Sequence, residues 1–596
     1  MSMDTRNDSG LNVEQANVLI RQMCDEEVEA RLSALRSLPF IAAALGPEKT
    51  RTDLLPYLQA TIDDEDEAMS LMAEQLPTLL PHLGGNDFSE QLLPILEELA
   101  SNEEAVIRSK ATKSLIQVAE QLSAEALERA YVPMVGRLVS AHWYTLRASS
   151  CALLPSLCTL LQTDAFRDSI IESLTILCRD DTAMVRRAAA EALKDMFQVV
   201  DANTAVTTLK PLYLQLAQDD QDSVRLLSVA VLPAIAKLTS SEAECRELVV
   251  PELQRFVRDV AWRVRYMLAD TITDVEANMP VRMRTDELIP VFTQLLRDSE
   301  AEVRRCAAGK VYDFCLALDP ETRVRTIVDA IVPCIESISQ DPNEHARASL
   351  ANVVMGLSSV VGAEETVRCL LPTFLRLLRD DDSQVRLNVI SRLSEVNAVI
   401  GLGHLSKPLL PAIEKLAKDA KWRVRLAIIE YLPTIAEQLG VEFFNSDLRP
   451  FCTEWLRDSV YAVRSAAVAN FQKLTKIFGE PWAISVVLPA LEELSESSNH
   501  VHRLTCLFAL KALTRDLTPD IVAGKLVPMT LSLSKDKIPN IRINVAKTLR
   551  VILQRLKHTP HLRPEVKTTL DTLAQDPDVD VSEYAKEALS SMDSFV

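Results

Sequence analysis

Apolar segments with helical spacing alternate with polar turns along nearly the whole chain. One example is the apolar run from Leu426 to Leu432, which follows a charged turn ending in Arg425. The arrangement recurs about every 39 residues and predicts pairs of helices that stack on their neighbours to bury their apolar faces. The arginine that opens the second segment stands at Arg108, Arg147, Arg186, Arg225, Arg265, Arg304, Arg347, Arg386, Arg425, Arg464, Arg503 and Arg542.

Prolines mark the first segment of each pair with the same period. A proline stands 14 residues before each of these arginines except Arg186, where Glu172 takes its place. The constant distance predicts a helix A kinked by the proline, a turn of fixed length, a helix B that starts at Val-Arg, and a link of variable length. With more degenerate units at both ends, we expect an all-α fold, an α–α superhelix (solenoid) of about fifteen repeats.

An aspartate stands six residues before most of these arginines. In a stack, the aspartates would line up beside the guanidinium groups, and a planar guanidinium can bridge a carboxylate and a backbone carbonyl. We therefore expect a structural Asp–Arg ladder between repeats, because a catalytic residue would not recur in each unit; the valine before the arginine is expected in the core. The expected members are Asp180, Arg186, Asp219, Arg225, Asp259, Arg265, Asp298, Arg304, Asp380, Arg386, Asp419, Arg425, Asp458 and Arg464.

The composition limits the function classes. The formal net charge is −20, which disfavours nucleic acid as a partner, and the 13 glycines form no phosphate-binding loop. The eleven cysteines lack CxxC spacing, which indicates reduced core thiols. We expect no cofactor, no secretory signal and no membrane span, and a cytoplasmic and nuclear location.

Two clusters of potential metal ligands are better explained as partner-facing turns. His500 and His502 form a pair without a nearby cysteine or carboxylate cluster, and the run Asp63-Asp-Glu-Asp-Glu67 is typical of a solvated acidic edge. We therefore expect no metal site.

The residues between the aspartate and the arginine indicate a binding surface, because the period does not dictate their identity. Most of these turns are polar, but large rings occur at Trp143, Trp262, Trp422 and Tyr461. An exposed tryptophan beside an arginine is typical of a binding hot spot. The alternative is that the rings fold back on the adjacent turn. Trp455 and Trp482 fall in or near helix A and are expected in the core.

Several strings resemble the 65 kDa scaffold (A) subunits of protein phosphatase 2A, a family built of HEAT repeats. They are Trp262-Arg-Val-Arg-Tyr-Met267, Lys421-Trp-Arg-Val-Arg-Leu-Ala-Ile-Ile-Glu-Tyr431, Gln438-Leu-Gly-Val-Glu-Phe-Phe444 and Asp578-Val-Asp-Val581. The resemblance covers all units and implies a hook of fifteen HEAT repeats without enzymatic activity. It also implies a heterotrimer, in which the phosphatase catalytic subunit binds the turns of repeats 11–15 and an exchangeable regulatory (B-type) subunit binds those of repeats 2–8.

The resemblance assigns two sets of residues to these partners. The catalytic-subunit set is Lys421, Trp422, Arg423, Val460, Tyr461, Asn499, His500, His502, Asp536 and Asn540. The regulatory-subunit set is Glu65, Glu67, Glu103, Glu104, His142, Trp143, Asp181, Thr182, Met184, Gln221, Asp222, Ser223, Trp262 and Arg263. One position departs from the family pattern: Ala183 stands where the family typically has proline, which leaves that turn more flexible.

We expect residues 1–10 to be a disordered tail and residues 11–596 to form a single solenoid. The regulatory subunit would bind residues of about 50–310, whereas the catalytic subunit would bind those of about 400–596. The main alternative is a transport receptor of the karyopherin type, although repeats of that type are usually less uniform in length. A HEAT-fold enzyme acting on DNA would need a basic channel, which the charge of −20 disfavours.

Overall fold

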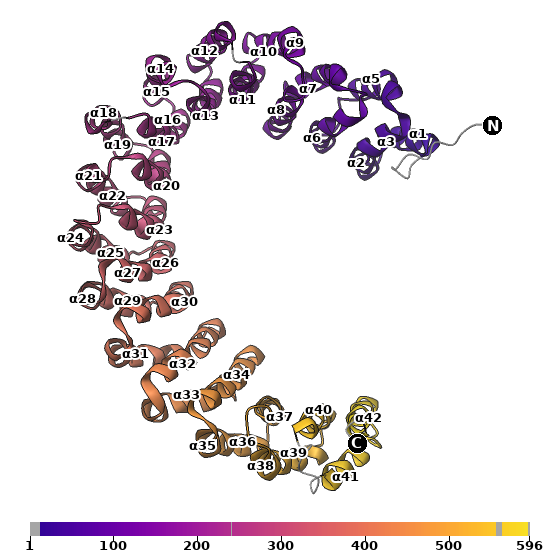
Figure 1. Cartoon of the computed structure of the whole chain (residues 1–596), viewed down its shortest axis with the longest axis vertical. Helices are drawn as coiled ribbons and strands as arrows, with labels where there is room; N and C mark the ends of the chain where they lie inside the picture. Colours follow the sequence, from indigo (N-terminus) through magenta and orange to yellow (C-terminus); the bar gives the residue numbers. More distant parts are fainter. Residues whose placement is uncertain (1–11, 162, 240, 556–562, 594–596) are drawn as a thin grey trace. The chain divides into compact units, whose positions relative to one another are not determined.

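The computed structural model describes residues 12–161, 163–239, 241–555 and 563–593, and these contain helices and turns but no strand. The predicted disordered tail, residues 1–10, lies outside the described residues. The chain divides into two compact units, unit 1 (Met1–Val303) and unit 2 (Arg304–Val596), and the division falls inside helix α23 (Ala301–Ala317). Within each unit, helix pairs follow one another in chain order (Figure 1), which confirms the predicted all-α repeat fold.

In unit 1, each repeat consists of a helix A and a helix B joined by a short turn. The segments of helix A are α1 (Val13–Gln22), α4 (Pro47–Lys49), η1 (Thr50–Leu54), α5 (Leu55–Ala60), η3 (Asn86–Leu92), α7 (Leu93–Leu99), α9 (Ala124–Ala126), η4 (Leu127–Tyr131), α10 (Val132–Val139), α12 (Asp164–Cys178), α14 (Ala202–Thr204), η5 (Ala205–Leu209), α15 (Lys210–Leu216), α18 (Glu242–Leu248), α19 (Val250–Phe256), α21 (Val281–Met283), η6 (Arg284–Leu288) and α22 (Ile289–Leu296). Those of helix B are α2 (Val28–Arg36), α3 (Leu38–Leu45), α6 (Asp66–Gln75), η2 (Leu76–His82), α8 (Ala105–Ala119), α11 (Tyr144–Leu160), α13 (Ala183–Val199), α16 (Asp222–Val229), α17 (Leu232–Leu238) and α20 (Trp262–Asn278).

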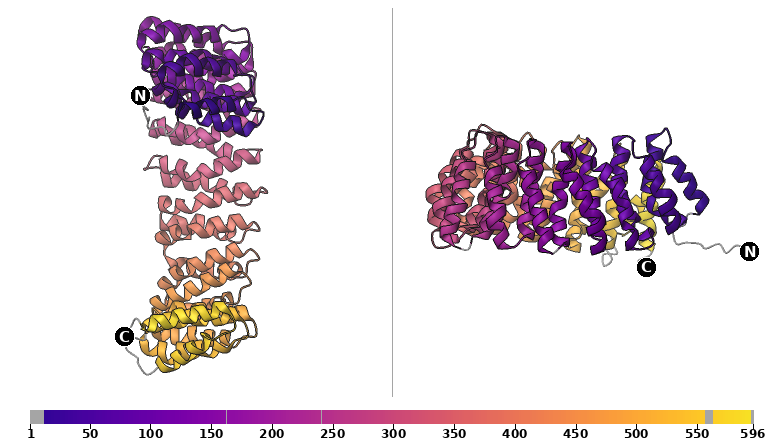
Figure 2. Two further views of the ribbon diagram at one scale, coloured as in Figure 1. Left: turned by 90° about the vertical axis from the view of Figure 1, so that its right-hand side faces the viewer. Right: turned by 90° about the horizontal axis from the view of Figure 1, so that it is seen from above.

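Unit 2 repeats the same arrangement, and its helices run roughly parallel, so that the turns gather at the helix ends (Figure 2). The segments of helix A are α24 (Arg323–Thr326), η7 (Ile327–Ile331), α25 (Val332–Ile338), α28 (Ala363–Glu365), η9 (Thr366–Leu370), α29 (Leu371–Leu377), α31 (Leu402–Ala417), η10 (Phe444–Leu448), α33 (Arg449–Trp455), α35 (Glu480–Trp482), η11 (Ala483–Val487), α36 (Leu488–Ser495), α38 (Pro519–Ile521), η12 (Val522–Leu526), α39 (Val527–Ser532), η13 (Leu533–Lys535) and α41 (Arg563–Leu573). Those of helix B are α26 (Glu344–Val353), η8 (Val354–Gly356), α27 (Leu357–Val361), α30 (Ser383–Ile400), α32 (Trp422–Phe443), α34 (Tyr461–Phe478), α37 (His500–Leu513), α40 (Pro539–Arg555) and α42 (Val579–Asp593).

In most repeats the predicted kink in helix A takes the form of a π-helical turn of five residues, whereas the repeat of Pro94 has a 3-10 segment and that of Pro251 a break between α18 and α19. In the repeat of Pro333, the π turn η7 ends one residue before α25, and the proline is the second residue of α25. Proline has no N–H, so Pro333 cannot bond to the carbonyl of Asp329 four residues earlier, and a regular α turn cannot close there. Helix α12, in which Glu172 replaces the proline, is an uninterrupted α-helix. Helix α31 is also continuous although it contains Pro411, so proline alone does not force the π turn.

Helix B begins two residues earlier than predicted. Helix α32 starts at Trp422 and helix α20 at Trp262, so the valine is the third residue of each helix and the ladder arginine the fourth. These two tryptophans therefore occupy the first helical position instead of the turn. Val264 and Val424 are completely buried, as are the valines that precede the other ladder arginines, which confirms their predicted place in the core.

Two further predictions concern the interior. Trp455 and Trp482 are 2% and 4% exposed, which confirms that they are core residues; their indole N–H groups donate to Ala417 O and Asn445 Oδ1, at 3.0 Å each. The eleven cysteines are free thiols, and most are buried. The expectation of core thiols is wrong for Cys24, which is exposed because it lies in the turn that follows helix α1.

Candidate partner-binding turns

The turn between helix A and helix B is held by the ladder aspartate itself. Asp419 Oδ1 accepts the backbone N–H of Lys421 at 2.8 Å, and Asp458 Oδ1 accepts that of Val460 at 2.8 Å. A side chain that bonds to the backbone two residues later fixes a tight turn. The conformation of the residues that follow, including Trp422, is therefore set by the aspartate.

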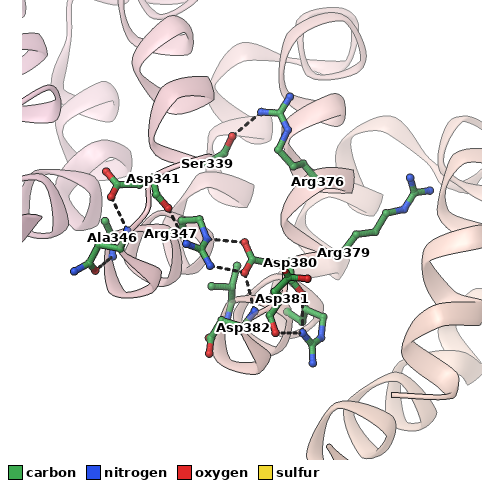
Figure 3. Close-up of polar contacts among 12 residues, drawn as sticks. Ser339, Asp341, Ala346, Arg347, Arg376, Arg379, Asp380, Asp381 and Asp382 are labelled. Atoms are coloured by element: carbon green, nitrogen blue, oxygen red, sulfur yellow. Dashed lines mark hydrogen bonds and ion pairs between the residues drawn. The ribbon is translucent and has the colours of Figure 1, made fainter. Parts of the chain in front are cut away.

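The ladder arginine then ties one turn to the next. Arg425 Nε and Nη2 donate to the two carboxylate oxygens of Asp458 at 2.8 and 2.9 Å, while its Nη1 donates to the backbone carbonyl of Asp419 at 2.6 Å. Figure 3 shows the same geometry around Arg347. The guanidinium thus bonds to the backbone of its own repeat and to the carboxylate of the following repeat.

The same ion pairs recur within each unit. In unit 1 they are Arg147–Asp180, Arg186–Asp219, Arg225–Asp259 and Arg265–Asp298. In unit 2 they are Arg304–Asp341, Arg347–Asp380, Arg386–Asp419, Arg425–Asp458, Arg503–Asp536 and Arg542–Asp576. Each aspartate therefore fixes its own turn and also binds the arginine of the preceding repeat. The spacing in the sequence did not indicate that the ion-pair partner belongs to the preceding repeat.

The electrostatics of the ladder follow from this geometry. Burial alone would raise the pKa of Asp298, but the hydrogen bonds from Arg265 and from the backbone N–H of Glu300 outweigh it, so that its pKa lies below the usual value. The side chains of Asp298 and Arg265 are 5% and 12% exposed. A charged pair this deeply buried is stable only when its hydrogen bonds are satisfied, which the bidentate geometry provides.

Two neighbouring turns of unit 2 carry the first residues of the catalytic-subunit set. Trp422 is half-buried, and the guanidinium of Arg423 lies 4.6 Å from the centre of its ring. Tyr461, the first residue of α34, is 60% exposed and meets Phe508 edge to face, with ring centres 6.4 Å apart. Lys421 is exposed and Val460 half-buried. These turns therefore present aromatic and cationic groups together.

The remaining residues of this set differ in accessibility. Asn499, His500 and Asn540 are exposed. His502 is half-buried, and burial first, then the nearby charges of Arg457 and Arg464, lower its pKa below the usual value. The side chain of Asp536 is only 7% exposed and both its oxygens bond to Arg503, so this carboxylate belongs to the ladder and does not form a free contact surface.

The regulatory-subunit set divides into an acidic and an aromatic part, both in unit 1. Its exposed acidic residues are Glu65, Glu67, Glu103, Glu104 and Asp181. Glu65 also lies 3.2 Å from Arg31, which pairs with Asp64 in a terminal version of the ladder. The other exposed members are His142, Trp143, Met184, Gln221 and Arg263, whereas Thr182, Asp222, Ser223 and Trp262 are half-buried.

The aromatic members of this set resemble those of unit 2 in geometry. Trp143 is 53% exposed and its ring centre lies 6.1 Å from that of Tyr144. The guanidinium of Arg263 lies 5.0 Å from the ring of Trp262, as Arg423 does over Trp422. Part of each tryptophan ring is therefore covered by its own neighbour, and part is available to a partner.

Two exposed apolar residues were not singled out by the sequence reasoning. Val260 is 96% exposed at the tip of the turn before Trp262, and Val579 is 77% exposed at the start of α42. Equivalent turns carry polar residues such as Asp220 and Ser459, or the small Ala420, at this position, so the larger apolar side chain of Val260 was a signal available in the sequence. A fully exposed valine beside a tryptophan and an arginine extends the apolar contact area of this turn.

No group of three or more metal-binding side chains occurs in the described part of the chain. The two ring nitrogens of His502 instead form hydrogen bonds with Ser497 Oγ at 3.0 Å and Asn499 Nδ2 at 3.3 Å. Among the same residues, no helix combines the length and hydropathy required to cross a bilayer.

Comparisons with known proteins agree on the fold. A PPP2R1A-like HEAT repeat model matches residues 282–362, and a HEAT repeat model matches residues 170–200. A chain in the solved complex of Kap95p with RanGDP superimposes with a TM-score of 0.60 over 98% of this chain and 78% of that chain, and one in the Kap95:Nup1 complex with 0.57 over 97% and 77%. At 13% and 12% sequence identity, these two likenesses show the helical-repeat fold alone.

Curated relatives are more similar in sequence. The A-type regulatory subunit of protein phosphatase PP2A from Saccharomyces cerevisiae is 41% identical over 98% of this chain and 94% of its own length. The beta isoform of the human 65 kDa A-type regulatory subunit is 45% identical over 58% of this chain and 57% of its own. The A-type subunit of Schizosaccharomyces pombe is 42% identical over 42% of this chain and 43% of its own. These names are those of regulatory, not catalytic, subunits, and the chain belongs to the family of A-type regulatory subunits of protein phosphatase 2A.

Proposed function

We propose that this chain is a non-catalytic scaffold that holds a protein phosphatase 2A catalytic subunit on the turns of its C-terminal repeats. The observation that carries the proposal is the 41% identity to an A-type regulatory subunit of PP2A over 98% of the chain. The aromatic and cationic group of Lys421, half-buried Trp422, Arg423 and Tyr461 supports the location, because tryptophan, tyrosine and arginine dominate binding hot spots. The karyopherin alternative has support from fold likeness alone.

We further propose that the turns of unit 1 hold an exchangeable regulatory subunit, which would complete a heterotrimer. The support is the second group of aromatic and cationic residues, Trp143, Trp262 and Arg263, beside the exposed acidic residues Glu103 and Glu104. A binding surface with both acidic and aromatic parts suits a partner that carries basic residues around apolar ones. A scaffold with two separate faces would bring substrate-directing and catalytic subunits together.

Trp422 and Trp262 provide a matched pair for the test. Each is half-buried, is the first residue of its helix B, and has the guanidinium of the next residue over its ring. The two alanine variants should therefore perturb the scaffold equally but damage different faces. Binding of purified catalytic and regulatory subunits to each variant would be measured by titration calorimetry.

We expect Trp422→Ala to weaken catalytic-subunit binding by roughly 30-fold or more, corresponding to about 2 kcal/mol, and Trp262→Ala to leave it nearly unchanged. The regulatory subunit should show the reverse preference. If wild type binds neither subunit, the scaffold proposal fails. If it binds both, but each variant behaves like wild type, the assignment of faces to these turns fails.

A further inference from the structure

The Asp–Arg ladder is interrupted at one step of unit 2. Ser497 occupies the position that is held by Asp458 in the turn before it. Arg464 is the ladder arginine of the preceding repeat, and its Nη1 donates to the backbone carbonyls of Asp458 and Ser459 at 2.7 and 3.0 Å, as in the other steps. Its Nε and Nη2, the atoms that bind the carboxylate at most other steps, have no hydrogen-bond or ion-pair partner among the described residues.

Arg464 is buried almost as deeply as a paired arginine of the same ladder. It is 9% exposed, compared with 7% for Arg386, whose guanidinium lies 2.7 Å from a carboxylate oxygen of Asp419. The free Nε and Nη2 atoms of Arg464 are not completely buried, so they can be reached from the surface of the turn. A guanidinium that is largely shielded from bulk water and has no counter-charge is less stable than a paired one, so this step of the ladder favours an additional negative group.

The neighbouring side chains of this chain do not meet that demand. The hydroxyl of Ser497 accepts the N–H of Asn499 at 3.3 Å and lies 3.0 Å from Nδ1 of His502, so it is engaged within its own turn. The carboxylate of Glu493 bonds to Arg457 at 2.6 Å. Burial first, and then the nearby charges of Arg457 and Arg464, lower the pKa of His502, so two cationic side chains lie close to this turn.

The surroundings of Arg464 belong to the turns that we assign to the catalytic subunit. The guanidinium lies 5.8 Å from the ring centre of Tyr461, which is 60% exposed, and the following turn presents the exposed residues Asn499 and His500. A protein docked on Tyr461 would therefore cover the gap left by Ser497. An aspartate or glutamate side chain has the planar two-oxygen geometry that the free Nε and Nη2 atoms require.

We propose that a carboxylate side chain of the protein docked on these turns takes the vacant ladder position and pairs with Arg464. This inference rests on the proposed binding of the catalytic subunit to the C-terminal turns. It assigns Arg464 as a residue whose carboxylate partner is supplied by the docked protein, whereas its counterparts at the paired steps find a carboxylate within the scaffold. The gap thus converts a structural arginine into a recognition site for an acidic side chain.

The direct test is to fill the gap from within the scaffold. Ser497→Asp supplies the missing carboxylate, and Ser498→Asp places the same charge on the adjacent exposed residue as a matched control. We expect Ser497→Asp to raise the melting temperature of the free scaffold and to weaken catalytic-subunit binding at least 10-fold, because the partner's carboxylate then meets an occupied site. Ser498→Asp should change affinity less than 3-fold.

Arg464→Gln provides the second arm and removes the guanidinium itself. It should also weaken binding at least 10-fold, and the double variant with Ser497→Asp should be no weaker than the worse single variant, because both changes remove one contact. Wild-type affinity for Ser497→Asp or an unchanged melting temperature would overturn the inference. Additive losses in the double variant would do so as well. Absence of binding by wild type would instead overturn the proposed function, so the two failures are distinguishable.

Discussion

The guanidinium of Arg347 binds three acceptor oxygens from two repeats at once. Nε and Nη2 donate to the carboxylate oxygens of Asp380 at 2.7 and 2.8 Å, and Nη1 donates to the backbone carbonyl of Asp341 at 2.7 Å (Figure 3). Asp380 in turn accepts the N–H of Asp382 at 2.9 Å, which fixes the next turn. One side chain therefore sets the spacing of two turns that belong to successive repeats.

Arg347→Lys should destabilise this region, since an ammonium group cannot donate two parallel hydrogen bonds to the carboxylate of Asp380 as the guanidinium does. We expect a loss of about 2 kcal/mol in local stability, the usual cost of lost hydrogen bonds to a buried charge. Hydrogen exchange should accelerate in the turn of residues 380–382. Arg325→Lys is the control, because that side chain is 89% exposed and its ion pair of 3.5 Å contributes little. Equal effects of both substitutions would contradict the structural role of the ladder.

Acid should weaken the ladder at Asp298, whose pKa is lowered in the folded state by Arg265 and the N–H of Glu300 despite its burial. A carboxylate with a lowered pKa contributes stability above the pKa of the unfolded chain, about 3.9, and loses it as the pH falls through the folded value. Asp298→Asn should therefore melt below wild type at pH 6, and the gap should close towards pH 2.5. Circular dichroism melts across this range give the test. A gap independent of pH would show that the charge of Asp298 is irrelevant.

The register of the fold could be predicted because it repeats. The constant distance between proline and arginine, and the valine before the arginine, correctly indicated helix A, the fixed turn and the buried valines. The same periodicity did not indicate which repeat supplies the arginine that pairs with each aspartate. Asp180 lies six residues before Arg186, yet its carboxylate pairs with Arg147 of the preceding repeat, because the helix offset between repeats decides which guanidinium reaches it.

Features that differ from repeat to repeat were harder to predict from the sequence. The π turns depend on how the backbone closes around each proline, and Pro411 shows that the residue type alone does not decide this. The gap at Ser497 could be read from the missing aspartate, but the burial of Arg464 that makes it important follows only from the packed helices. The position of the Arg423 guanidinium over the ring of Trp422 likewise depends on side-chain rotamers, which the spacing of residues in the sequence does not define.

Glycine has opposite roles at two positions of unit 2. Gly479 ends helix α34 with φ 85° and ψ 172°, a conformation that is essentially restricted to glycine. Gly524 lies inside η12 without a positive φ, and a Cβ there would meet no atom within 4 Å. We expect Gly479→Ala to destabilise by about 1–3 kcal/mol and Gly524→Ala to stabilise by about 0.5–1 kcal/mol. Changes of the same sign in thermal melts would show that backbone conformation does not decide the outcome.

Glu276, near the end of helix α20, is completely buried, and neither of its carboxyl oxygens has a hydrogen-bond partner among the described residues. Burial raises its pKa to about 8, although the charge of Arg284 opposes the shift. Unfolding releases the proton at any pH between about 4.5 and about 8, so the stability of the wild type falls as the pH rises through this window. The loss is complete above the folded pKa.

Glu276→Gln removes the titrating group but keeps the shape of the side chain. We expect the variant to melt within about 2 °C of wild type at pH 5, where Glu276 is protonated in the folded chain, and several degrees above it at pH 9. Glu247→Gln, at an exposed position of the same unit, should show no such dependence. A constant difference between the Glu276 variant and wild type from pH 5 to 9 would mean that this carboxyl group stays ionised in the fold, and hence that a counter-charge or water reaches it.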